Sequence, residues 1–144
     1  MNAQPTMTSA ARFVAFRLLP GDDLLAGLDA HVIDQGIKAG WVAGVVGSLS
    51  QASLRFAGEP GSTQLTGAFE IIALSGMLDA EGGHFHLSIA DARGMMRGGH
   101  VMPGCIVRTT CELVVGDLDS VVFQRKPCSL SGYSELVISS RKPR

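Results

Sequence analysis

The alternation of apolar and polar residues along the chain predicts one helix near the start, followed by a run of β-strands. Residues 12–19 alternate in character and predict a first strand, which Pro20 and Gly21 end. Asp22 then offers a helix N-cap, and Asp23 lies in the first turn, where the helix dipole favours a carboxylate. The apolar stripe of this helix consists of Leu24, Leu25, Leu28, Val32 and Ile37, and Gly36 supplies a terminator. We expect the helix to pack on a sheet.

From Trp41 onward the pattern changes to that of strands. The predicted strands cover residues 41–46, 51–56, 69–78, 84–90, 95–102, 105–115, 121–124 and 134–138, the last two closing the sheet. Gly47 and Ser48 end the first of them, and residues 58–66 form a Gly/Pro/Ser/Thr-rich loop. Residues 69–78 are apolar on both faces, which predicts a central strand covered on each side. One main helix beside a mostly antiparallel sheet is an α+β fold.

Composition indicates one domain that associates with other copies. The chain has 144 residues, of which 46% are hydrophobic and only 17% charged, with a mean hydropathy of +0.25. A small monomer must cover its surface with polar groups, so this apolar excess predicts an oligomer. No apolar run reaches the 18 residues that a membrane-spanning helix needs, so we expect no membrane association. We divide the chain into a disordered segment (1–11), the domain (12–138) and a basic tail (139–144).

The net charge bears on nucleic-acid binding, and the cysteines bear on the cellular compartment. The formal net charge is −1, whereas nucleic-acid modules usually show a clear basic excess, because counterion release drives their binding. Cys105, Cys111 and Cys128 form no CxxC pair, and the first two lie in an apolar strand, as buried thiols do. A reducing cytoplasm fits these cysteines best, so we expect a cytoplasmic protein.

The candidate chemistry lies in three histidines. His84 and His86 are two apart, which on a strand puts both rings on one face. A returning strand would bring His100 alongside, with Gly98 and Gly99 as a bulge or tight bend that aims it. Three imidazoles can hold a transition metal, zinc first, with one coordination position left open. The alternative is a pair of solvated strand histidines with His100 packed nearby, and the residues alone leave both interpretations open.

Two glutamates are the candidates for a catalytic role beside such a metal. Glu70 and Glu112 each lie within an apolar strand, where a buried carboxylate is costly unless it is paired. Arg108 falls on the same face as Glu112, so an ion pair between them or across a subunit boundary is the plain explanation. The sharper hypothesis makes Glu70 or Glu112 a hydrogen-bond partner of a ligand or a proton acceptor near the metal.

Several short motifs stand in an order that resembles a known family. They are Pro20-Gly21-Asp22, Gly47-Ser48-Leu49, Gly67-Ala68-Phe69-Glu70-Ile71-Ile72, His84-Phe85-His86-Leu87-Ser88 and Gly98-Gly99-His100. Their order and spacing, over about residues 12–138, resemble the plants-and-prokaryotes conserved domain (PPC, DUF296). The resemblance implies a homotrimeric α+β domain, with a metal in some relatives on the positions of His84, His86 and His100. Prokaryotic relatives that consist of this domain alone are commonly labelled DNA-binding.

The chain departs from the plant members of the family in two places. Ala68 stands where their partner-interaction motif usually has arginine. The Arg-Gly-Arg-Pro core of their DNA-binding AT-hook, which fits a narrow minor groove, is absent, because residues 141–144 read Arg-Lys-Pro-Arg. We therefore interpret the chain as a regulatory or interaction module of the DNA-associated type through resemblance alone, with an unproven DNA or protein partner. A hydrolase-like metal enzyme and a purely structural metal are the alternatives, so whether the chain is an enzyme stays open.

Overall fold

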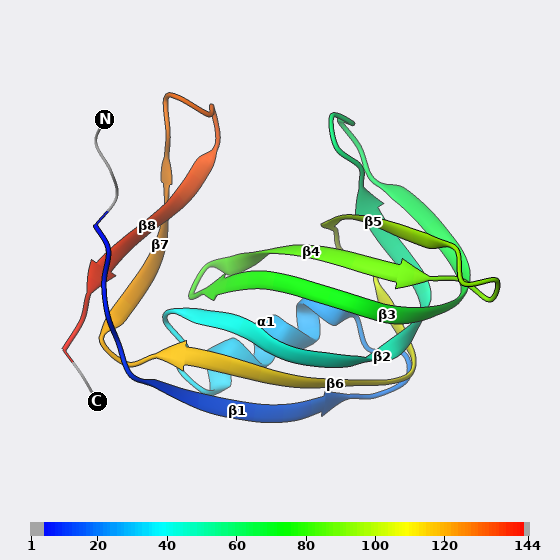
Figure 1. Cartoon of the computed structure of the whole chain (residues 1–144), viewed down its shortest axis with the longest axis horizontal. Coiled ribbons are helices and arrows are strands. Elements are labelled where there is room, and N and C mark those ends of the chain that lie inside the picture. Colours follow the sequence, from blue (N-terminus) through cyan, green and yellow to red (C-terminus); the bar gives the residue numbers. More distant parts are fainter. Residues whose placement is uncertain (1–4, 143–144) are drawn as a thin grey trace.

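The computed structural model describes residues 5–142, which form one large sheet, one helix and a separate two-stranded hairpin (Figure 1). The large sheet has the order β1-β6-β2-β3-β4-β5, and every neighbouring pair is antiparallel. The elements are β1 (Ala11–Leu18), α1 (Leu24–Asp34), β2 (Gly40–Arg55), β3 (Thr63–Asp79), β4 (Gly82–Ala90), β5 (Met96–Val101), β6 (Ile106–Leu118), β7 (Val121–Pro127) and β8 (Ser134–Ser140). The predicted α+β class, with one helix and a mostly antiparallel sheet, is confirmed.

Helix α1 forms where the apolar spacing predicts it, with its N-cap one residue later. Asp23, not Asp22, is the N-cap: its carboxylate accepts a hydrogen bond from the Ala26 N–H at 3.0 Å. Asp22 instead accepts from the Leu19 N–H at 2.8 Å and so closes the turn after β1. Gly36 follows the helix with a φ of +61°, as the predicted terminator requires. At eleven residues α1 is too short to cross a bilayer, and residues 5–142 contain no longer helix.

Strand β2 is one long strand where the sequence predicted two. Gly47 and Ser48 do not end it, and the strand continues to Arg55 with register irregularities. A Cβ on Gly47 would lie 2.3 Å from the Thr110 carbonyl oxygen of β6, so this glycine permits close backbone approach and does not mark a turn. The predicted loop over 58–66 is also too long, because β3 begins at Thr63.

The long reach of β2 lets the sheet curl back on itself. Leu54 and Arg55, at the end of β2, pair with Val101 and His100 of β5, the strand at the far edge of the sheet order. Strands β2 to β5 therefore close on one another, and Figure 1 shows the end of β2 bending out of the sheet towards β5. The apolar side chains inside this closed part include Leu49, Leu54, Leu87, Ile89 and Val101.

The two faces of the sheet differ in cover. Helix α1 packs on the inner face through Leu24, Leu28 and Val32. The opposite face, here called the outer face, exposes large apolar side chains: Phe13, Val46, Ile72, Met77 and Val114. The prediction that β3 is covered on each side is therefore wrong for the single chain, because no element of residues 5–142 lies over Ile72 and Met77.

The last two strands do not close the large sheet, contrary to the prediction. Strands β7 and β8 pair with each other only and stand off the sheet as a hairpin (Figure 1). Their base has a small core of its own, in which Val121 and Phe123 pack with Ala39. Near the tip of the hairpin, Tyr133 lines the same two cavities as His84 and His100.

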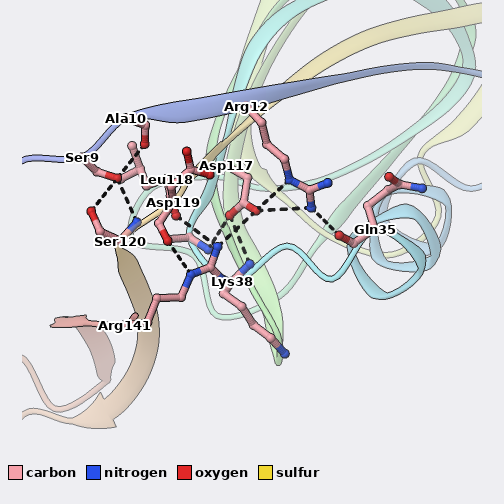
Figure 2. Close-up of polar contacts among 11 residues, drawn as sticks. Ser9, Ala10, Arg12, Gln35, Lys38, Asp117, Leu118, Asp119, Ser120 and Arg141 are labelled. Atoms are coloured by element: carbon pink, nitrogen blue, oxygen red, sulfur yellow. Dashed lines mark hydrogen bonds and ion pairs between the residues drawn. The ribbon is translucent and has the colours of Figure 1, made fainter. Parts of the chain in front are cut away.

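A buried carboxylate ties the ends of the chain to the sheet (Figure 2). The Asp117 side chain accepts hydrogen bonds from the backbone N–H groups of Lys38 at 3.2 Å and Ala39 at 3.1 Å. It also faces the guanidinium groups of Arg12 at 3.5 Å and Arg141 at 3.7 Å. The base of the hairpin, the start of β1 and the loop after α1 therefore meet at one charge.

The terminal segments proposed from sequence are described in part. Residues 1–4 of the segment expected to be disordered and residues 143–144 of the basic tail lie outside the described residues. Within the described part, residues 5–10 have no regular secondary structure, although the Ala10 carbonyl accepts a hydrogen bond from the Asp119 N–H at 2.9 Å.

Candidate metal centre

Strand β4 holds His84 and His86 on one face by the two-residue period of a strand. Phe85 and Leu87, on the opposite face, are buried in the core, as the alternation predicts. The register depends on glycine in the neighbouring strand, because a Cβ on Gly76 would lie 2.2 Å from the Phe85 ring. Packing of the core side thus fixes the direction in which the two imidazoles point.

Strand β5 brings the third ring beside them. His100 pairs directly with His86 across the β4–β5 ladder, so both side chains leave the sheet on the same face. Gly98 and Gly99 lie within a regular strand, so the predicted bulge is wrong. Gly99 instead allows close approach to β2, because its Cβ would lie 2.8 Å from the Arg55 carbonyl oxygen.

The three rings converge. The ring centroid of His84 lies 4.9 Å from that of His86 and 5.0 Å from that of His100. The centroids of His86 and His100 are 5.9 Å apart. One ring nitrogen from each histidine falls within 4.8 Å of the others, and the Nε2 atoms of His84 and His86 are 3.2 Å apart.

These distances fit a transition-metal ion. With metal–nitrogen bonds of about 2.0–2.1 Å, a tetrahedral ion holds its ligand nitrogens about 3.3–3.4 Å apart. The His84–His86 separation of 3.2 Å is already close to that value, and the ligand nitrogens of all three histidines lie within 4.8 Å of one another. The donor set, three imidazoles without a carboxylate or thiolate, suits zinc and its neighbours in the first transition row.

The electrostatics of the cluster favour the neutral, metal-binding form of the rings. Partial burial lowers the pKa of His84, and the nearby positive charges of His86 and Arg125 lower it further against an opposing effect of Glu135. Burial also lowers the pKa of His100, followed by the charges of Arg55 and the other two histidines. A neutral imidazole has a lone pair to donate, so these shifts favour metal binding at neutral pH.

The cluster opens into a hollow between the body and the hairpin. One cavity of about 780 Å³ and an adjoining one of about 540 Å³ share four lining residues: Arg55, His84, His100 and Tyr133. The first continues along the β2–β3 loop, and the second runs towards Asp79, Glu81 and Glu135. His84 and His86 are exposed and line the larger cavity, so an ion bound to them would have space for a further ligand.

The two glutamates singled out from the sequence lie elsewhere. Glu70 and Glu112 are exposed in the chain and not buried as expected, and neither lines either cavity. No ion pair joins Arg108 to Glu112 within residues 5–142. The carboxylates that border the cavities are those of Glu59, Asp79, Glu81 and Glu135.

Sequence reasoning missed Arg55, Tyr133 and Glu135 as neighbours of the histidines. No motif marks them, because Arg55 reaches the cluster only through the curl of β2, and the other two only through the position of the hairpin. The cysteines take no part: Cys105 and Cys111 are buried free thiols, as predicted, and burial raises the pKa of Cys111 to about 11.

Comparison with known proteins places this fold among relatives. Residues 6–119 match the family model of the Plants and Prokaryotes Conserved (PCC) domain. Two curated Synechococcus proteins, each named bifunctional protein GlmU, are 44% and 45% identical over 135 residues, which is 94% of this chain. The chain spans only 21% and 22% of their length, about a fifth.

Solved structures show the same fold. A hypothetical protein from Salmonella is 51% identical with a TM-score of 0.93, over 94% of this chain and 99% of that one. A metal-containing protein from Archaeoglobus fulgidus is 20% identical with a TM-score of 0.79, over 93% and 99% of the two chains. A Bacteroides thetaiotaomicron structure described as a "putative dna binding protein" is 19% identical with a TM-score of 0.76, over 89% and 96%. The last two likenesses show the fold alone.

Proposed function

Since the chain belongs to the Plants and Prokaryotes Conserved domain family, we propose that it is a cytoplasmic, homotrimeric module of that family that binds a metal ion at His84, His86 and His100. The observation that carries the proposal is the convergence of one nitrogen from each ring to within 4.8 Å on an exposed face. The role is regulatory or one of interaction, since the ion lies where a partner or small ligand can reach it.

Zinc is the ion that the donor set fits best. Neutral imidazole binds Zn²⁺ well, and three protein ligands with one open position is an arrangement that zinc commonly takes outside closed structural sites. When bound, such an ion is a Lewis acid towards an oxygen atom of a ligand. His84, His86 and His100 would hold the ion at the strand surface, where these residues line the hollow.

Metal content tests this proposal directly. We expect purified protein to contain close to one zinc per chain by elemental analysis, and His84→Ala to lose most of it. The matched control is His31→Ala, which removes the fourth histidine, whose ring stacks on Phe16 away from the cluster. Equal metal in both variants would show that the three rings do not hold the ion. Loss of metal without a fall in melting temperature favours a functional ion, and a large fall favours a structural one.

The outer face supports the proposed trimer. Its exposed apolar side chains come from four neighbouring strands, β1, β6, β2 and β3, and a single chain leaves them in water. The histidines lie on this same face, because Met77 pairs with His84 across the β3–β4 ladder. Sedimentation of Ile72→Asp should show a shift towards monomer, whereas Ile33→Asp, the same change at an exposed position on α1, should leave the assembly intact. An unchanged mass for Ile72→Asp would place the interface elsewhere.

A metal-dependent hydrolase is the second candidate, and the size of the hollow favours it. Its larger cavity of about 780 Å³ falls in the range of small-molecule sites, and Glu135 lines the adjoining cavity together with His84. Glu135 therefore replaces Glu70 and Glu112 as the candidate proton acceptor. Zinc-dependent hydrolysis of simple esters that Glu135→Gln reduces and Glu70→Gln leaves unchanged would establish this activity, and equal rates in both variants would exclude that role for Glu135.

Direct DNA contact is the remaining form of the regulatory role, suggested by the description of the Bacteroides neighbour. A mobility shift with AT-rich and random duplexes at low and moderate salt tests it. The formal net charge of −1 argues for weak binding at best. If no shift occurs even at low salt, the interaction role belongs to a protein or a small ligand.

A further inference from the structure

A row of side chains crosses three strands beside the candidate metal centre. Arg55 of β2 pairs with His100 of β5, and His100 pairs in turn with His86 of β4. Directly paired residues point to the same face with Cβ atoms about 4.5–5.5 Å apart. The Arg55 side chain therefore starts beside the His100 ring, and it lines both cavities together with His84 and His100.

Arg55 lies on the wall of the hollow without a polar partner among the described residues. No hydrogen bond or ion pair of its guanidinium occurs within residues 5–142, although the residue is half-buried. The other arginine at this hollow differs, because the Arg125 Nε atom lies 3.1 Å from a carboxylate oxygen of the buried Asp79. Arg55 is thus a cation without an ion-pair partner on the wall of the hollow, next to a cluster whose ligands are neutral.

We propose that Arg55 and the three-histidine centre together form a binding site for the oxyanion group of a small molecule, a phosphate or a carboxylate. The inference deepens the proposed function and rests on metal binding there. Three neutral imidazoles leave the full charge of a divalent ion, and the guanidinium adds one more, so the site favours an anion. A planar guanidinium donates two parallel hydrogen bonds to such a group, which leaves another oxygen free for the ion.

The walls of the hollow favour a small molecule over a nucleic-acid backbone. A volume of about 780 Å³ suits a metabolite-sized ligand. Glu59, Glu81 and Glu135 border the hollow and would repel the further phosphates of a polyanion. Tyr133, on the hairpin, offers an aromatic ring to the remainder of a small ligand.

The test uses cobalt(II) in place of zinc, because its visible absorption reports on what enters its coordination sphere. Inorganic phosphate and acetate are titrated separately into the Co²⁺-loaded full chain, into Arg55→Gln and into Arg97→Gln. The last is the matched control, since it removes the same charge from β5 at a residue that lines neither cavity of the hollow. A random DNA duplex is the third ligand.

We expect a saturable spectral change with phosphate or acetate in the unmodified chain and in Arg97→Gln. Arg55→Gln should take up the same amount of cobalt but bind the anion about tenfold to a hundredfold more weakly, the loss typical of a charge-assisted contact. Equal anion affinity in Arg55→Gln would overturn the inference while leaving the metal site intact. If only the duplex binds in an Arg55-dependent manner, the small-molecule assignment is wrong, and a chain that takes up no cobalt refutes the metal site and this inference together.

Discussion

Replacing Asp117 by alanine removes the carboxylate on which the two ends of the chain converge. Two backbone N–H groups lose their acceptor, of which that of Ala39 is buried and that of Lys38 partly buried. Each unsatisfied donor costs about 1–3 kcal/mol according to its burial. Arg12 and Arg141 lose a counter-charge as well, but their side chains are 35% and 16% exposed, so water replaces part of that interaction. We expect a loss of about 3–4 kcal/mol in the free energy of unfolding.

The isosteric substitution separates the two contributions. Asp117→Asn keeps an oxygen for both N–H groups but places an NH2 group, which cannot accept a hydrogen bond, where Oδ2 faces Arg12 and Arg141, so its cost should be about 1–2 kcal/mol. The control is Asp34→Asn, the same change at an exposed carboxylate, with an expected effect within about 0.5 kcal/mol. Urea denaturation at one fixed protomer concentration measures all three, because association would otherwise shift the midpoint. If Asp117→Ala matches Asp34→Asn, or if Asn costs as much as Ala, the account of this carboxylate is wrong.

Three further predictions follow from single sites. The pKa values of His84 and His100 are lowered from 6.5, so protons compete with the metal only in acid. Zinc affinity, measured by competition with a chelator, should therefore stay level near neutral pH and fall as the pH drops below 6.5. A loss of affinity that begins in alkaline buffer would contradict this. Gly47→Ala should lower the melting temperature by at least several degrees, since its Cβ would meet a backbone carbonyl at 2.3 Å, and an unchanged melting temperature would show that β2 and β6 can separate at no cost. A thiol reagent should label Cys128 of the native chain within minutes and Cys111 only after denaturation, because the latter is buried with a pKa of about 11; equal rates would show that the sheet opens readily.

The local features of this chain could be predicted from the sequence because they depend on neighbours along it. The position of α1 follows from the spacing of Leu24, Leu28 and Val32, and its end from the glycine at 36. The orientation of His84 and His86 away from the core follows from the two-residue period of a strand. These are consequences of backbone geometry, which acts within a few residues.

Glycine misled the sequence interpretation where its role was tertiary. Gly47 looked like the end of a strand, and Gly98 and Gly99 looked like a bulge, but Gly47 and Gly99 allow another strand to approach closely. Whether a glycine serves a turn or a contact depends on which backbone lies opposite, and one sequence does not state that. The same limit made β2 appear as two strands.

The amino-acid sequence by itself determined the class of the fold, the helix and the shared face of the paired histidines. Tertiary structure alone decided that β2 bends to meet β5, and this pairing places Arg55 beside His100. It also decided that the hairpin stands apart from the large sheet, with Tyr133 and Glu135 beside His84, and that the outer face lies bare in the single chain. Each of these depends on pairings between segments tens of residues apart, whose stability is set by the register and packing of the whole sheet and not by any local pattern.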